Sequence, residues 1–136
     1  MNLLNVEKEA TRLNTQNMKL LATLQEHFGN EVPIFMDGVS EEELPKDNMT
    51  YIFIETGNFT MANDKSKAMR ETVRINYFHE GRPNPTLDRL KIVNAGIDVG
   101  LKIDSTTQDT VILDETNRLI GVFVCDFWRL ALKGCG

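Results

Sequence analysis

The first segment of the chain has apolar residues at helical spacing. Gly29 follows Phe28 as a helix-stop signal, so the pattern predicts a helix from about Leu3 to Phe28. Such a helix is roughly 39 Å long at about 1.5 Å per residue, which is long for so small a domain. We expect its early part to fray or to pack on another chain. The apolar stripe consists of Leu3, Val6, Ala10, Leu13, Leu20 and Leu24.

Alternating segments follow this helix and predict strands. A short apolar strand covers Val32–Met36, and an acidic loop comes after it. Thr50–Met61 and Met69–Tyr77 then alternate apolar and polar residues on either side of a polar tip at Ala62–Lys67. We therefore predict strands and a long hairpin over positions 32–79, with a mobile tip.

The rest of the sequence predicts a second helix and a second hairpin. Pro83 and Pro85 end the first hairpin, and the helix covers positions 86–101. The C-terminal hairpin covers positions 109–132, with its turn at Glu115–Arg118. The predicted apolar side of the second helix consists of Leu90, Val93, Ile97 and Leu101.

These elements predict an α+β fold in a single domain covering residues 1–136. Each helix has one apolar stripe while the strands alternate, so we expect both helices on one face of an antiparallel or mixed sheet. The chain is 41% hydrophobic and 26% charged, which is typical of a soluble domain. Its apolar runs are too short to span a membrane. The first residues of the sequence do not form the apolar core of a signal peptide. We expect a cytoplasmic protein without a membrane partner.

The net charge of the chain restricts the classes of partner that it is expected to bind. The sequence has 15 Lys and Arg residues against 20 Asp and Glu residues, a formal net charge of −5. Its basic residues are not clustered along the sequence. Because an acidic surface repels phosphates, this composition disfavours a nucleic-acid-binding protein.

Candidate catalytic and metal-binding groups are few. His27 and His79 have no partner at zinc-like spacing, and Glu41–Glu43 lacks the alternating spacing of calcium ligands. Cys125 and Cys135 are interpreted as buried or idle thiols. No phosphate-binding loop, nucleophile elbow or paired-cysteine motif occurs. We expect no catalytic residue, cofactor or metal, and a small-molecule enzyme built from scattered residues ranks last among the hypotheses.

The order of the predicted segments along the chain is similar to that of a known protein family. After the N-terminal helix come Val32–Gly38, an acidic loop ending in Leu44-Pro45, Tyr51–Glu55, Glu71–Phe78 and Thr86–Leu90. This layout resembles that of the tail terminator proteins of long-tailed bacteriophages, also called tail-to-head joining or tail completion proteins. The likeness is one of layout, and it assigns no functional residue.

The resemblance implies a structural virion protein without an active site. Members of that family form a ring, typically a hexamer, that caps the finished tail tube and presents a surface to the head connector or head-completion protein. The implied partners are further copies of the chain, the tail tube protein and the head connector, with DNA only as passing cargo. The implied location is the tail–head junction of the virion, after assembly in the bacterial host cytoplasm. An acidic chain would suit a channel through which DNA slides without sticking.

A candidate subunit or tail interface lies before the tip of the long hairpin. Phe59 and Met61 share the parity of Tyr51 and Phe53, so they would extend an apolar strip beyond what one domain covers. The competing interpretation is that they pack on their own sheet or helix. The polar residues expected around the strip are Asn63, Asp64 and Lys65.

A second hypothesis belongs to a different class of protein. A small α+β adaptor would bind a protein or peptide through an open sheet edge or through its N-terminal helix. The mass in solution distinguishes the two hypotheses, because an adaptor is a monomer or dimer and a tail terminator forms rings.

Overall fold

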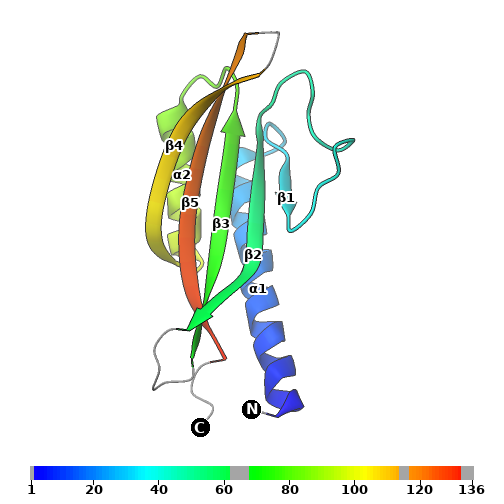
Figure 1. Cartoon of the computed structure of the whole chain (residues 1–136), viewed down its shortest axis with the longest axis vertical. Coiled ribbons are helices and arrows are strands. Elements are labelled where there is room, and N and C mark those ends of the chain that lie inside the picture. The colour runs from blue at the N-terminus through cyan, green and yellow to red at the C-terminus, as the bar shows by residue number, and fades with distance from the viewer. Residues whose placement is uncertain (1, 62–67, 114–116, 133–136) are drawn as a thin grey trace.

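The computed structural model describes residues 2–61, 68–113 and 117–132, which form a five-stranded mixed sheet with two helices packed on one of its faces (Figure 1). This confirms the predicted α+β fold with its long hairpin. The elements are α1 (Leu3–Phe28), β1 (Ile34–Met36), β2 (Tyr51–Met61), β3 (Met69–His79), α2 (Pro85–Asp98), β4 (Lys102–Leu113) and β5 (Arg118–Ala131). The predicted tip at 62–67 and the first half of the predicted turn at 115–118 lie outside the described residues.

The strands are ordered β1-β2-β3-β5-β4. β1 pairs parallel with β2, and every other pairing is antiparallel. The alternation of the strands places one set of apolar side chains against the helices. On the strands this core consists of Ile52, Ile54, Val73, Ile75, Tyr77, Phe123, Cys125 and Phe127.

Helix α1 spans the range that its apolar spacing predicts. It begins where the side chain of Asn2 accepts a hydrogen bond from the Asn5 amide at 3.0 Å, and it ends at Gly29, whose φ is 59°. Only its C-terminal half contributes to the core, through Leu20, Leu24 and Phe28. The first turns of the helix extend past the strands (Figure 1). The apolar side chains of Leu3 and Val6 in these turns are exposed.

The buried face of helix α2 overlaps the predicted one only in part: Val93 packs against the core and Leu101, just beyond the helix, is in it. Leu90 and Ile97 are exposed, and the buried positions are Asp88, Ile92, Ala95 and Gly96. Position 96 accommodates only a glycine, because a Cβ atom there would overlap the ring of Phe127. The helix also ends at Asp98, earlier than predicted, because the chain turns through Gly100 with a φ of 94° into β4.

A β-bulge interrupts the pairing of β2 with β3. Glu55 pairs with Arg74 and Asn58 pairs with Thr72, so β2 has one more residue than β3 between these pairs. Gly57 lies in the bulge with a φ of 92°, a conformation that other residues rarely adopt. The bulge reverses the alternation of β2 beyond this point.

The predicted parity of the hairpin is therefore wrong at its far end. Phe59 pairs with Glu71, whose side chain points to the helices, so Phe59 and Met61 lie on the helix face. Tyr51 and Phe53 lie on the opposite face, because their neighbour Ile52 is in the core. A parity count along the sequence has no means of detecting the extra residue.

Strand β4 begins at Lys102, well before the predicted start of the C-terminal hairpin at 109. Each residue from Lys102 to Ile112 is exposed, so neither face of β4 requires apolar side chains. The backbone ladder with β5 holds the strand instead. The hydrophobic alternation that reveals a half-buried strand is consequently missing from Lys102–Gln108.

Candidate functional site: the open edges of the sheet

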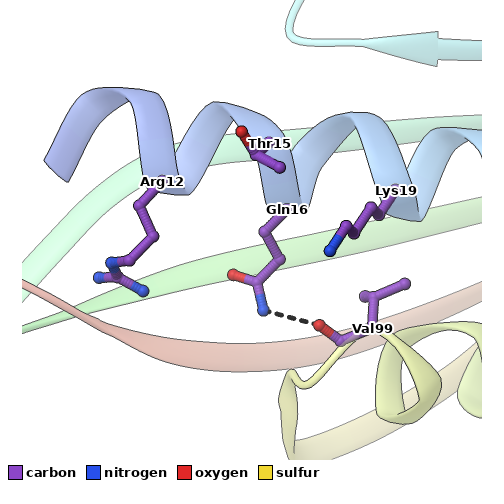
Figure 2. A pocket seen from close by; sticks show the side chains of 5 residues that line it. All are labelled: Arg12, Thr15, Gln16, Lys19 and Val99. Carbon is purple, nitrogen blue, oxygen red and sulfur yellow. Dashed lines mark hydrogen bonds between the residues drawn. The ribbon is translucent and has the colours of Figure 1, made fainter. Parts of the chain in front are cut away.

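A hollow of about 300 Å³ lies between α1 and the turn that leads from α2 into β4 (Figure 2). The Gln16 side chain spans it and donates from Nε2 to the Val99 carbonyl at 2.9 Å. The residues that line the hollow are Arg12, Thr15, Gln16, Lys19 and Val99. These side chains include neither a carboxylate, a histidine nor a thiol, so the hollow has no acid–base pair or activated nucleophile.

The arginine of this hollow is part of an internal clamp. Arg12 donates from Nε and Nη2 to the Glu9 carboxylate, at 2.9 Å for each bond, and from Nη2 to the Leu130 carbonyl at 2.9 Å. Glu9 in turn accepts from the Leu132 amide at 2.9 Å. The hydrogen bond with Glu9 raises the pKa of Arg12. The clamp ties the N-terminal half of α1 to the end of β5.

A buried ion pair fixes the bulge of β2. Arg129 donates from Nε to Glu71 Oε1 at 2.8 Å, and both side chains are only 4% exposed. Glu71 Oε2 accepts from the amide of Gly57 at 2.8 Å. Arg129 also donates from Nη1 to the Leu13 carbonyl at 3.2 Å and to the side chain of Gln16 at 3.1 Å. The pair therefore links α1, β3, β5 and the bulge that turns Phe59 towards the helices.

A second polar cluster joins α2 to the sheet. Tyr77 donates to Asp88 Oδ2 at 2.6 Å, and Arg82 donates to the same atom at 2.8 Å. Burial opposes ionisation of Asp88, but the hydrogen bonds from Arg82 and Tyr77 outweigh it, and the pKa of Asp88 lies below its ordinary value. The ring of His79 stacks on Tyr77. Because Asp88 is 2% exposed and its oxygens are bonded internally, this cluster anchors α2 and is closed to a substrate.

The candidate ligands and nucleophiles of the sequence do not come together. Within the described ranges, no group of three His, Cys, Asp or Glu residues could hold a metal ion. Cys125 is in the core, where burial raises the pKa of its thiol to about 12. Cys135 lies outside the described residues. Neither helix in the described part of the chain is long and apolar enough to cross a membrane.

Strand β4 forms one open edge of the sheet. Of the strands that the structure describes, none pairs with β4 on the side away from β5. Ile103 is 44% exposed there, and its cross-strand partner is Phe127 in the core, so Ile103 lies on the helix face. Helix α2 lies behind β4 and β5 (Figure 1). Its Leu90 and Ile97 side chains are exposed. Exposed edges of this length are normally protected from pairing with other chains.

The opposite edge of the sheet is only partly covered. β1 pairs with β2 along Ile52–Ile54, and the carboxylate of Asp37 then accepts from the amide and hydroxyl of Thr56 at 2.6 Å each. Beyond that point, none of the described strands pairs with Gly57–Met61 on its outer side.

This stretch holds the apolar part of the interface that the sequence predicts. Phe59 is 46% exposed and Met61 is 53% exposed. The polar part, made of Asn63, Asp64 and Lys65, lies outside the described residues. Sequence reasoning missed the counterpart on the β4 edge, because Ile103 is an isolated apolar residue in a polar segment.

Comparison of the sequence with models of known protein families and with curated proteins found no match. The features that bear on function are therefore the fold, its open edges and the layout of its elements.

Proposed function

We propose that this chain is a structural virion protein whose copies form a ring that caps a phage tail tube and joins it to the head connector. The observation that carries the proposal is the pair of open edges on the described sheet, β4 on one side and Gly57–Met61 on the other. Different surfaces on opposite sides of a subunit are what a head-to-tail ring requires. Such a contact closes on itself when the rotation between copies allows it.

The order of the elements supports the same proposal. An N-terminal helix, a short strand, a hairpin, a second helix and a second hairpin occur in the order that resembles the tail terminator proteins. The net charge of −5 would suit a ring through which DNA passes as cargo. The partners proposed are further copies of this chain, the tail tube protein and the head connector protein.

The buried charged groups are bonded within the fold, which favours a role in assembly over one in catalysis. The buried charges in the described part of the chain, Glu71, Asp88 and Arg129, all bond to other groups of the fold. The hollow beside α1 lacks acid–base and nucleophilic side chains. A small-molecule enzyme would need titratable groups facing a cavity, which these clusters do not provide.

Light scattering and negative-stain microscopy test the proposal. The full chain is measured over a range of concentrations, alone and with purified tail tubes that lack a cap. We expect closed rings, and we expect the rings to sit at one end of the tubes and to stop further addition of tube protein. A strictly monomeric particle under both conditions contradicts the proposal. A monomer or dimer that binds a peptide and leaves the tubes uncapped favours the adaptor instead.

A further inference from the structure

We infer that neighbouring copies in the ring join through a charged contact, in which the acidic turn Glu41–Glu43 of one copy binds in a basic hollow of the next. The hollow lies between α1 and the start of β4, and the carboxylates of Glu41 and Glu42 pair there with Lys19 and Lys102. The inference rests on the proposed ring and identifies a surface that closes it. The occupant of the hollow is a second copy of this chain.

The basic hollow consists of two adjoining spaces. The hollow of about 300 Å³ beside α1 continues into a second one of about 170 Å³, and Arg12 and Gln16 line both. Lys19 lines the first space, where its side chain leaves α1 on the same side as those of Arg12 and Gln16 (Figure 2). Lys102 and Arg129 line the second. None of the described residues that line either space has a carboxylate, so four cationic side chains surround one concave surface.

Two of these cations have counter-charges within the subunit and two do not. Arg12 and Arg129 form ion pairs with carboxylates of their own chain. Lys19 and Lys102 are exposed, and in the described ranges neither ammonium group pairs with a carboxylate. Lys102 contacts only an aromatic face, with its Nζ atom 5.8 Å from the centre of the Trp128 ring. The hollow therefore attracts a partner that carries negative charge.

The acidic turn carries that charge on the same chain. Glu41, Glu42 and Glu43 are consecutive and all exposed. The carboxylate of Glu43 is used within the turn, where it accepts from the hydroxyl of Ser40 at 3.0 Å. Those of Glu41 and Glu42 pair with no cation among the described residues. Two uncompensated carboxylates of one copy thus match two uncompensated ammonium groups of the next.

The loop that carries the acidic turn is fixed at both ends. Where it leaves β1, the carboxylate of Asp37 accepts from the amide of Thr56 at 2.6 Å. Before it enters β2, Arg118 donates to the carbonyls of Lys46 and Asp47 at 3.2 Å each. Between these anchors the loop projects away from the sheet (Figure 1). A turn held on a fixed base loses less conformational freedom when it binds.

The acidic turn and the basic hollow lie towards opposite edges of the sheet. The turn follows β1 at one edge, and the hollow lies where β4 begins at the other, so the contact between copies is head-to-tail. The two surfaces differ in level. The loop leaves β1 at the level of Cys125 on β5, and the hollow is level with Trp128–Leu130, about 10 Å or more further along the strand. Rotation about the ring axis brings them together when the strands are inclined to that axis.

Reversal of the charges tests the contact. Lys19→Glu with Lys102→Glu gives a hollow-reversed variant, and Glu41→Lys with Glu42→Lys gives a turn-reversed variant. Each variant alone places like charges opposite each other, so we expect the yield of rings to fall at least about tenfold. In an equal mixture, every hollow meets a turn of opposite charge when the two variants alternate around the ring. We therefore expect the mixture to recover rings that contain both variants in equal amounts.

Matched controls reverse the same number of charges elsewhere. Lys8→Glu with Lys46→Glu changes two exposed lysines that do not line the hollow, and Glu7→Lys with Glu26→Lys changes two exposed glutamates outside the turn. Both controls should form rings as the wild type does. Thermal unfolding of all four variants is compared with that of the wild type, and we expect unchanged midpoints because every substituted side chain is exposed.

The outcomes separate the inference from the proposed ring. Rings that form equally well from either reversed variant, or variants that stay deficient when mixed, overturn the charged contact and leave the ring standing. A hollow-reversed variant that forms rings normally and binds duplex DNA more weakly assigns the hollow to phosphates, and it overturns the contact as well. A wild-type protein that stays monomeric with and without tail tubes overturns both the contact and the ring.

Discussion

Glu71 and Arg129 form an ion pair between neighbouring strands, with 2.8 Å between Oε1 and Nε, under the N-terminal half of α1. Removing charges from water is costly, and the surrounding hydrogen bonds offset part of that cost. Here they come from Gly57 to the carboxylate and from the guanidinium to Leu13 and Gln16. The pair thus couples the docking of α1 to the shape of the β2 edge.

Breaking this pair should cost far more stability than breaking an exposed pair between the same two strands. We expect Glu71→Gln to lower the free energy of unfolding by about 3–5 kcal/mol, because it leaves the buried Arg129 uncompensated. Arg74 and Asp126 also link β3 to β5, but their side chains are more exposed, so Arg74→Met should cost about 1 kcal/mol or less. Urea unfolding measures both, and equal losses would contradict the difference in burial.

Acidification should destabilise the fold through Glu80. Hydrogen bonds from Arg118, and one from the Met49 amide, hold the pKa of Glu80 at about 2, below its ordinary value of 4.5. A lowered pKa in the folded state stabilises the protein above the unfolded value, and that stabilisation is lost as the pH falls from about 4.5 towards about 2. Thermal midpoints should therefore drop over this range. Glu80→Gln should flatten the drop, and an unchanged pH profile in that variant would argue against the assignment.

The position of α2 should depend on the absence of a side chain at Gly96. We expect Gly96→Ala to lower the free energy of unfolding by about 1–3 kcal/mol, because the new methyl group overlaps the Phe127 ring in the core. Gly38→Ala is the control, since a Cβ atom there has no described neighbour within 4 Å. Phe127→Leu combined with Gly96→Ala should recover part of the loss if the overlap is the cause. Chemical denaturation of the three variants measures these differences.

The parts of the fold that the sequence predicts are those where burial controls residue choice. The stripe of α1 and the alternation of β3 indicate their elements because Leu20, Leu24, Val73 and Ile75 must meet in one core. The polar half of β4 pairs with β5 through its backbone and buries no apolar side chain, so its sequence shows no hydrophobic alternation.

Part of the face of α2 and the far end of β2 were predicted wrongly for local reasons. On α2, Leu90 and Ile97 are exposed, and a buried polar residue and a glycine face the sheet instead. Asp88 bonds to Arg82, and Gly96 admits the ring of Phe127. On β2, the bulge at Gly57 reverses the faces of the residues that follow. These features depend on partners distant in the sequence, which a periodic pattern does not include. The open edges follow from the strand order, which periodicity does not specify either.

The exposed apolar residues at the far end of β2, Phe59 and Met61, should matter for assembly and not for folding. In Phe59→Ser combined with Met61→Ser, we expect a change of about 0.5 kcal/mol or less in the free energy of unfolding, because both side chains are about half exposed in the subunit. Ring formation and tail capping should be lost, since serine removes the apolar area that a neighbouring copy would cover. Met18→Ser, at an exposed position on α1, serves as the control and should retain both properties. Unfolding is followed by circular dichroism and assembly by light scattering on the same samples. A large loss of stability in the isolated double variant would assign Phe59 and Met61 to the core of their own subunit and remove them from the interface.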